Sequence, residues 1–119
     1  MSREESVYLQ DIVASCDKVL RFTKNLHLPD LIQDEKTYDA VVRNLEIIGE
    51  AAKHISEDIR AQITDIEWRK IAGMRDMLAH AYFGIDNDIL WDVVKNKVPQ
   101  LDKAINAFLN EQNGNSESR

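Results

Sequence analysis

Four side chains that could carry out chemistry together stand close to one another in the second half of the chain: Arg75, Asp76, His80 and Tyr82. Histidine can take up a proton near neutral pH, and the arginine guanidinium presents a fork of donors that fits a phosphate. An RNA strand brings its own nucleophile, the 2′-hydroxyl, so its cleavage needs a base for that proton and a cation for the charge on the phosphorane. Arg75 and His80 are therefore candidate catalytic residues for RNA cleavage without a metal or other cofactor.

The spacing does not let Arg75 and His80 meet within one straight helix. At about 100° per residue their side chains diverge by about 140°, whereas Asp76 and His80, four residues apart, share one face. Two copies of the helix that cross near a two-fold axis could each give its arginine to the other's histidine. The spacing therefore predicts a symmetric homodimer with both pairs in one cleft.

An ordinary structural role for these residues is the alternative. Arg75 could pair with Asp76 or another carboxylate, and His80 could cap the helix end, where a positive charge is favourable. Exposed charges are usually only solvated, so the spacing by itself favours this alternative. Tyr82 could likewise be an aromatic side chain at the edge of the core or of an interface.

Two blocks in a fixed order resemble one protein family. The spacing Arg75-x4-His80-x-Tyr82 is similar to the RX4HXY motif of the HepT-like ribonuclease toxins in the HEPN superfamily. The segment 43–51 resembles a second block of that family. An arginine and a histidine at this spacing occur by chance in many helices, but several blocks in the right order are much more specific.

The resemblance covers roughly residues 5 to 110, which is nearly the whole chain. Trp68 and Trp91 also stand where the family usually has tryptophan. The chain departs from the family pattern at two positions: Asp76 stands where members commonly have Asn, and Glu67 stands where they often have Pro.

The resemblance implies a metal-independent endoribonuclease whose catalytic residues are Arg75 and His80, with a cyclic phosphate as the product. Asp76 is then expected to orient one of them. Such proteins are toxins of prokaryotic toxin–antitoxin systems of the type VII kind and act in the cytoplasm. Their motif tyrosine, here Tyr82, accepts AMP from a cognate minimal nucleotidyltransferase that serves as the antitoxin. AMP would place negative charge and bulk where the RNA phosphate must bind, so AMPylation would silence the site.

A second function comes from a different class of protein. The chain could be a non-catalytic helical module that binds a nucleotidyltransferase partner, a nucleotide, or both. Its net charge of −6 favours this alternative, because proteins that bind nucleic acids without sequence preference usually carry a basic face.

The hydrophobic periodicity predicts an all-α, up-down four-helix bundle, and the resemblance implies that this bundle is HEPN-like. The expected helices are 4–26, 35–56, 64–83 with Thr64 or Asp65 as its N-cap, and 86–108, kinked or broken at Pro99. Residues 1–112 are expected to form one domain, and 113–119 a disordered polar tail. Gly49 interrupts the second helix, which predicts close approach by another backbone, since glycine inside a helix costs about 1 kcal/mol relative to alanine.

The composition excludes several other classes of protein. The only cysteine, Cys16, allows neither a disulfide framework nor a cysteine-based metal site, which fits a reducing cytoplasm. No apolar run approaches the length of about 20 residues that a membrane span needs, so no membrane is expected. His27, His54 and His80 share no metal-ligand spacing, so no metal site is expected.

A row of polar residues lies along one face of the second expected helix: Glu46, Glu50 and His54 recur every four residues. We interpret this row as a solvated face or a hydrogen-bonding network, with Arg43 as its expected partner.

The expected dimer needs apolar side chains that the core of one chain does not use. Met77 and Phe83 are the candidates for this contact, with help from Trp68 or Trp91.

Overall fold

The computed structural model describes residues 1–79 and 84–117, and within these ranges every regular element is helical. In chain order the elements are α1 (Arg3–Thr23), α2 (Leu28–Gln33), α3 (Glu35–Lys53), α4 (Glu57–Gln62), α5 (Trp68–Ala79), α6 (Asn87–Asp92), the π-helical turn η1 (Val93–Lys97) and α7 (Val98–Glu117). The predicted all-α class is confirmed. Both α1 and α3 match their expected ranges to within three residues.

The two long helices α1 and α3 form because each has a strong N-cap and one apolar stripe. The Ser2 hydroxyl accepts a hydrogen bond from the Glu5 N–H, and the Asp34 carboxylate does the same for the Thr37 N–H. The stripes then pack against each other in the core. Their fully buried side chains include Leu9, Ile12, Val19, Val41, Leu45 and Ile48.

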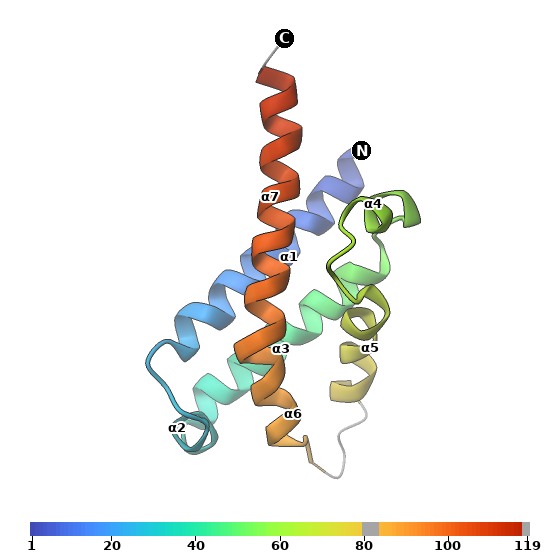
Figure 1. Ribbon diagram of the computed structural model, residues 1–119. Coiled ribbons are helices and arrows are strands. Elements are labelled where there is room, and N and C mark those ends of the chain that lie inside the picture. The colour runs from blue at the N-terminus through green and yellow to red at the C-terminus, as the bar shows by residue number, and fades with distance from the viewer. Residues whose placement is uncertain (80–83, 118–119) are drawn as a thin grey trace.

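The helix α3 lies between two others, α1 and α5. It packs against α1 on one side and α5 on another, and α1 in turn packs against α7 (Figure 1). In the view of Figure 1, α7 crosses α1 and extends beyond it towards the C-terminus, while α5 lies at the side of α3. The middle of α3 is therefore held between α1 and α5.

Short α4 fixes the far end of α3. Ser56 caps α4, and its N–H donates a hydrogen bond of 3.1 Å to the Glu5 carboxylate at the start of α1. The Arg60 guanidinium donates to the Ala52 carbonyl over 2.7 Å. These two bonds tie the end of α3 and the start of α1 to the same short helix.

The start of α5 differs from the expectation. Thr64 and Asp65 were expected to cap it, but the helix begins at Trp68, and the Ile71 N–H donates to the Glu67 carbonyl at the first turn. The cap prediction is therefore wrong, since Thr64 and Asp65 form a turn that ends before the helix begins.

Of the two tryptophans offered for a dimer contact, Trp68 or Trp91, Trp68 is not available for one. Its side chain is buried, and its indole N–H donates a hydrogen bond of 3.1 Å to the Ile63 carbonyl. The Arg60 guanidinium lies 5.9 Å from its ring centre. Trp68 thus belongs to the core of this chain.

From Asn87 to Glu117 the backbone is helical throughout, although its helix type changes. In η1 the Val98 N–H donates to the Val93 carbonyl, five residues earlier, and Pro99 follows directly after this bond. Because proline has no N–H and its ring crowds the preceding turn, a wider turn ahead of it relieves the strain. The structure thus has a π-helical turn just before Pro99, where the sequence led us to expect a kink or a break.

The last helix is longer than expected. α7 continues to Glu117, whereas the composition of residues 113–119 favoured a disordered tail. Among the described residues, no helix combines the length and apolar character needed to cross a bilayer.

A hydrogen bond between distant residues fixes the start of α6. The Tyr38 hydroxyl on α3 donates to the Asn87 side chain over 2.6 Å. Partial burial of the ring raises the pKa of Tyr38, which keeps this hydroxyl a donor. Gly84, with φ of +101°, precedes α6 in a conformation that other residues rarely adopt.

Candidate functional site

Close packing of α3 on α5 places Arg75. A β-carbon at Gly49 would meet the backbone nitrogen of Arg75 at 2.9 Å and the Ile71 carbonyl at 3.2 Å. Only glycine leaves room for this approach, so the close contact predicted at Gly49 is confirmed. The backbone of Arg75 consequently sits directly against the middle of α3.

The side chain of Arg75 is held by a carboxylate on the neighbouring helix. Its Nε lies 2.9 Å from Oε2 of Glu50, and the arginine side chain remains 46% exposed. The ion pair uses Nε of the guanidinium, and the terminal nitrogen Nη1 lies 3.9 Å from Oδ1 of Asp76. The sequence suggested a carboxylate partner for Arg75 but did not identify Glu50.

Glu50 also contacts a histidine, and that histidine stacks on an aromatic ring. Its other carboxylate oxygen lies 3.7 Å from Nε2 of His54, a pair that is ionic only when His54 is protonated. The His54 ring in turn stacks on Tyr8 of α1, with ring centres 4.5 Å apart and planes 10° apart. Three helices thus contribute to one connected row of side chains from Tyr8 to Arg75.

The polar row predicted on the second helix is therefore a network of contacts. Arg43 pairs with Glu46 at 3.6 Å, as the sequence suggested. Glu50 instead reaches across to Arg75. The four-residue spacing placed Glu50 on a polar face of α3. Only the crossing of α3 and α5 shows that its partner is Arg75.

Asp76 contacts a lysine more closely than it contacts Arg75. Its Oδ1 lies 3.6 Å from Nζ of Lys53 on α3 and 3.9 Å from Nη1 of Arg75. The second distance is too long for a hydrogen bond. Asp76 thus adds a second ion pair between α5 and α3, beside that of Glu50.

A hollow of about 450 Å³, which we call the Arg75 groove, opens beside this network. It lies where α1, α3 and α5 meet. Its lining residues are Tyr8, Asp11, Arg43, Glu46, Ile47, Glu50, Ala51 and Arg75. Two guanidinium groups, three carboxylates and one aromatic ring therefore face the same volume.

His80 and Tyr82, the expected base and AMP acceptor, lie outside the described residues, as does Phe83. The side chain of Met77 is likewise not described. Of the predicted site residues, Arg75 and Asp76 are the two whose surroundings are described. Among the described residues, no group of three metal-ligating side chains could hold a metal ion.

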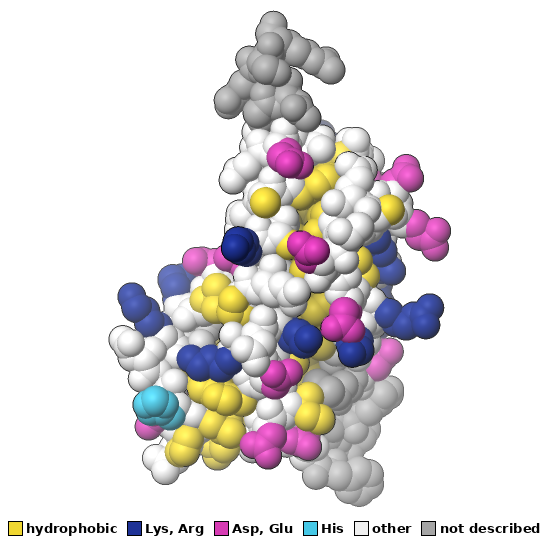
Figure 2. Space-filling view, in the orientation of Figure 1, with side chains coloured by type: hydrophobic (Ala, Val, Ile, Leu, Met, Phe, Trp, Pro, Cys, Tyr) yellow, Lys and Arg dark blue, Asp and Glu magenta, His cyan; other side chains and the backbone are white. Residues whose placement is uncertain are grey.

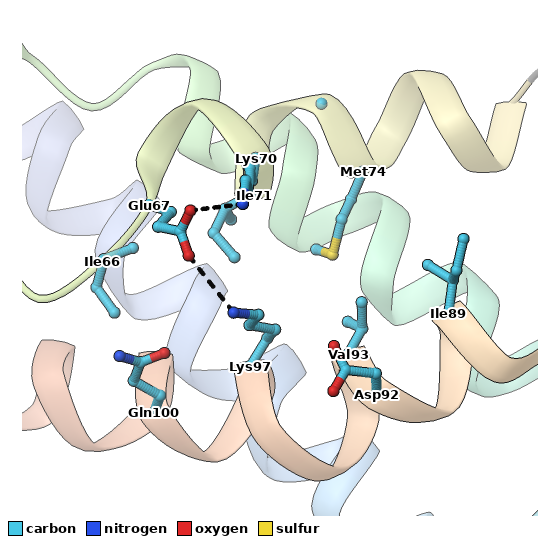
Figure 3. A pocket seen from close by; sticks show the side chains of 11 residues that line it. Ile66, Glu67, Lys70, Ile71, Met74, Ile89, Asp92, Val93, Lys97 and Gln100 are labelled. Atoms are coloured by element: carbon cyan, nitrogen blue, oxygen red, sulfur yellow. Dashed lines mark hydrogen bonds and ion pairs between the residues drawn. The ribbon is translucent and has the colours of Figure 1, made fainter.

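A second hollow lies between α5 and the column formed by α6 and η1 (Figure 3). It measures about 410 Å³, and its walls are largely apolar, with Ile71, Met74 and Val93 among them. At one edge the Glu67 carboxylate lies 2.8 Å from Nζ of Lys70 and 3.5 Å from that of Lys97. Arg75 does not line this second hollow, so the second hollow and the Arg75 groove are separate sites.

Charges of both signs are interspersed on the face drawn in Figure 2. Lys and Arg side chains lie beside Asp and Glu side chains there rather than gathering into one basic area. Contact with a nucleic acid on the described part of this face would therefore gain little from counterion release.

Comparisons with known proteins give a consistent answer. The family model described as "Ribonuclease HepT-like" matches residues 12–108. A protein of Thermococcus cleftensis named "Probable ribonuclease HepT" is 45% identical over 101 residues, which cover 85% of this chain and 92% of that protein. A protein of Methanocaldococcus jannaschii named "Putative RNase MJ0127" is 36% identical over 116 residues, which cover 98% of this chain and 96% of that protein.

The comparison with solved structures finds no match. The family model nevertheless covers most of the chain, including α3, α5 and the residues that line the Arg75 groove on both helices. The relatives are covered over nearly their whole length, so the similarity extends over entire proteins. The chain therefore belongs to the HepT-like ribonuclease family.

Proposed function

We propose that the protein is a metal-independent endoribonuclease that cleaves RNA through the 2′-hydroxyl, with Arg75 and His80 as its catalytic residues. The observation that supports this role most directly is how Arg75 is placed and held. The absence of a side chain at Gly49 lets the backbone of Arg75 approach α3. Glu50 then pairs with the guanidinium, and the arginine side chain remains half exposed. The glycine therefore fixes the backbone of residue 75, and the ion pair fixes the guanidinium at the end of its side chain.

In the proposed mechanism, His80 removes the 2′-hydroxyl proton and the oxygen attacks the adjacent phosphorus. The terminal nitrogens of Arg75 stabilise the negative charge that builds up on the phosphorane oxygens. The bond from phosphorus to the 5′-oxygen then breaks, the leaving oxygen takes a proton from solvent water, and a 2′,3′-cyclic phosphate remains. Asp76, which contacts Lys53, contributes by keeping α5 against α3 and by orienting the catalytic pair.

The proposed active form is a homodimer. Because Arg75 and His80 diverge by about 140° on one helix, each site takes its arginine from one chain and its histidine from the other. The proposed up-down arrangement of four helical units in each chain, α1, α3, α5 and the α6–η1–α7 column, leaves α5 free to meet its copy. Mixing an Arg75→Ala chain with a His80→Ala chain should then restore one site per dimer.

The proposed biological role is that of a toxin controlled by a cognate minimal nucleotidyltransferase. Transfer of AMP to Tyr82 adds a phosphate next to the catalytic pair and blocks RNA. The intact mass of the protein, measured with and without coexpression of such an enzyme, should show AMP additions that disappear in Tyr82→Phe.

Growth and cleavage assays test the proposal. Expression of the unmodified protein should arrest growth, and both Arg75→Ala and His80→Ala should relieve the arrest. Purified protein should cleave mixed RNA in the presence of a chelator. If neither substitution changes cleavage or toxicity, the assignment of the two residues is wrong; if no state of the protein cleaves RNA, the non-catalytic module that binds a nucleotidyltransferase is the better description.

A further inference from the structure

The Arg75 groove contains groups that the cleavage chemistry does not use. Tyr8 and Asp11 on α1 line it together with Arg75, although both are far in the sequence from the proposed catalytic residues. Its volume of about 450 Å³ lies within the range of small-molecule sites. We infer that the groove binds one nucleotide of the RNA next to the cleaved bond, and that it prefers guanine. This inference rests on the proposed function of Arg75.

The charges of the groove indicate which part of the nucleotide lies in it. The three carboxylates of Asp11, Glu46 and Glu50 outnumber the guanidinium groups of Arg43 and Arg75. A phosphate inside the groove would be repelled, whereas a neutral base that donates hydrogen bonds would be attracted. The base therefore occupies the groove, and the phosphates follow its arginine-bearing edge.

Two of the three carboxylates are already engaged. Glu46 pairs with Arg43, and Glu50 pairs with Arg75. Asp11 is exposed and has no cationic partner within 4.0 Å in the described part of the chain. It is therefore the acceptor that the base can use.

The structure also supplies a prepared surface for stacking. Tyr8 is held in place from one side by the parallel ring of His54, whose own position is tied to Glu50. Single-stranded RNA is recognised in this way, by stacking of its bases on aromatic rings. Tyr8 and Asp11 lie three residues apart on α1, so they face the same part of the groove.

The preference for guanine follows from the acceptor. A carboxylate can accept two parallel hydrogen bonds from N1–H and the exocyclic N2 amine of guanine. Adenine and cytosine offer it an exocyclic amine alone, and uracil offers one ring N–H. One good bidentate contact to a base changes affinity by about tenfold or more.

Binding of mononucleotides to the full chain tests the inference without cleavage. In NMR titrations, guanosine monophosphate should shift the ring resonances of Tyr8 and His54 and bind about tenfold more tightly than uridine monophosphate. Asp11→Asn should abolish this difference, and Tyr8→Ala should weaken both nucleotides. Asp39→Asn, which removes an exposed carboxylate elsewhere on α3, is the matched control and should change neither.

A second measurement uses cleavage positions. Sequencing of the RNA ends should show guanine next to the cut in the wild type and lose this preference in Asp11→Asn. Equal binding of the two nucleotides, or cleavage positions unchanged by Asp11→Asn and Tyr8→Ala, would overturn the inference. If cleavage still required Arg75 in that case, the proposed function would stand. Guanine-selective binding without any cleavage would reject the proposed function but support the groove as a guanine site.

Discussion

The backbone nitrogen of Arg75 occupies space that a side chain at Gly49 would need. An added β-carbon would lie 2.9 Å from this nitrogen and 3.1 Å from Cβ of Arg75. Neither atom belongs to the flexible end of a side chain, so the two helices would have to separate. One glycine thus controls both the packing of α5 on α3 and the position of the candidate catalytic arginine.

Gly49→Ala should therefore destabilise the protein although alanine favours helices. We expect a net loss of about 1–3 kcal/mol in the free energy of unfolding, measured by chemical denaturation, together with reduced RNA cleavage. Gly73→Ala is the matched control, because a β-carbon there meets nothing within 4 Å. It should gain about 0.5–1 kcal/mol from helix propensity alone. Equal effects of the two substitutions would show that α5 is not packed as described.

Glu50→Gln tests how Arg75 is positioned. The substitution keeps the size of the side chain but removes the charge that holds the guanidinium at 2.9 Å. We expect cleavage to slow by about tenfold or more, since small displacements of catalytic groups are costly. Because both partners are half exposed, the free energy of unfolding should change little. Asp39→Asn should leave the cleavage rate unaltered, and an unaltered rate in Glu50→Gln as well would exclude a positioning role.

Trp68→Phe should cost stability through a buried hydrogen bond. The phenylalanine ring cannot donate to the Ile63 carbonyl, which is 3.1 Å from the indole nitrogen, and it leaves part of the space empty. We expect a loss of about 1–3 kcal/mol in thermal or chemical unfolding. Trp91→Phe is the comparison, since Trp91 is only partly buried and Lys95 lies over its ring at 4.9 Å. A larger loss at Trp91 than at Trp68 would contradict the assignment of Trp68 to the core.

Glu67 should contribute a pH-dependent part of the stability. Lys70, followed by Lys97, lowers the pKa of the Glu67 carboxyl in the folded protein. A lowered folded pKa means that the contribution is fully present above the unfolded pKa, about 4.3, and is lost as the pH falls through the lowered value. The wild type should thus unfold at a higher temperature than Glu67→Gln near neutral pH, and the difference should vanish in acid. A difference that persists below the folded pKa would rule out this ion pair as its cause.

The sequence predicted the long helices α1 and α3 well because their buried positions recur at helical spacing. It also predicted the close approach at Gly49 from the cost of glycine in a helix. It did not predict the pairing of Glu50 with Arg75, because a partner on another helix depends on where two helices cross. The cap of α5 was misassigned, since Thr64 and Asp65 satisfy the rules for a cap but form a separate turn before the helix begins.

The π-helical turn η1 has a consequence for how this region tolerates insertions and deletions during evolution. Leu90, Val94 and Val98 are buried at steps of four residues, which on a regular α-helix would rotate away from the core by about 40° per step. The wider turn absorbs this rotation. A relative that lacks one residue within 93–97 could therefore form an ordinary α-turn and keep both flanking faces buried. The same deletion elsewhere in this helical column would turn everything beyond it by about 100° and expose the core.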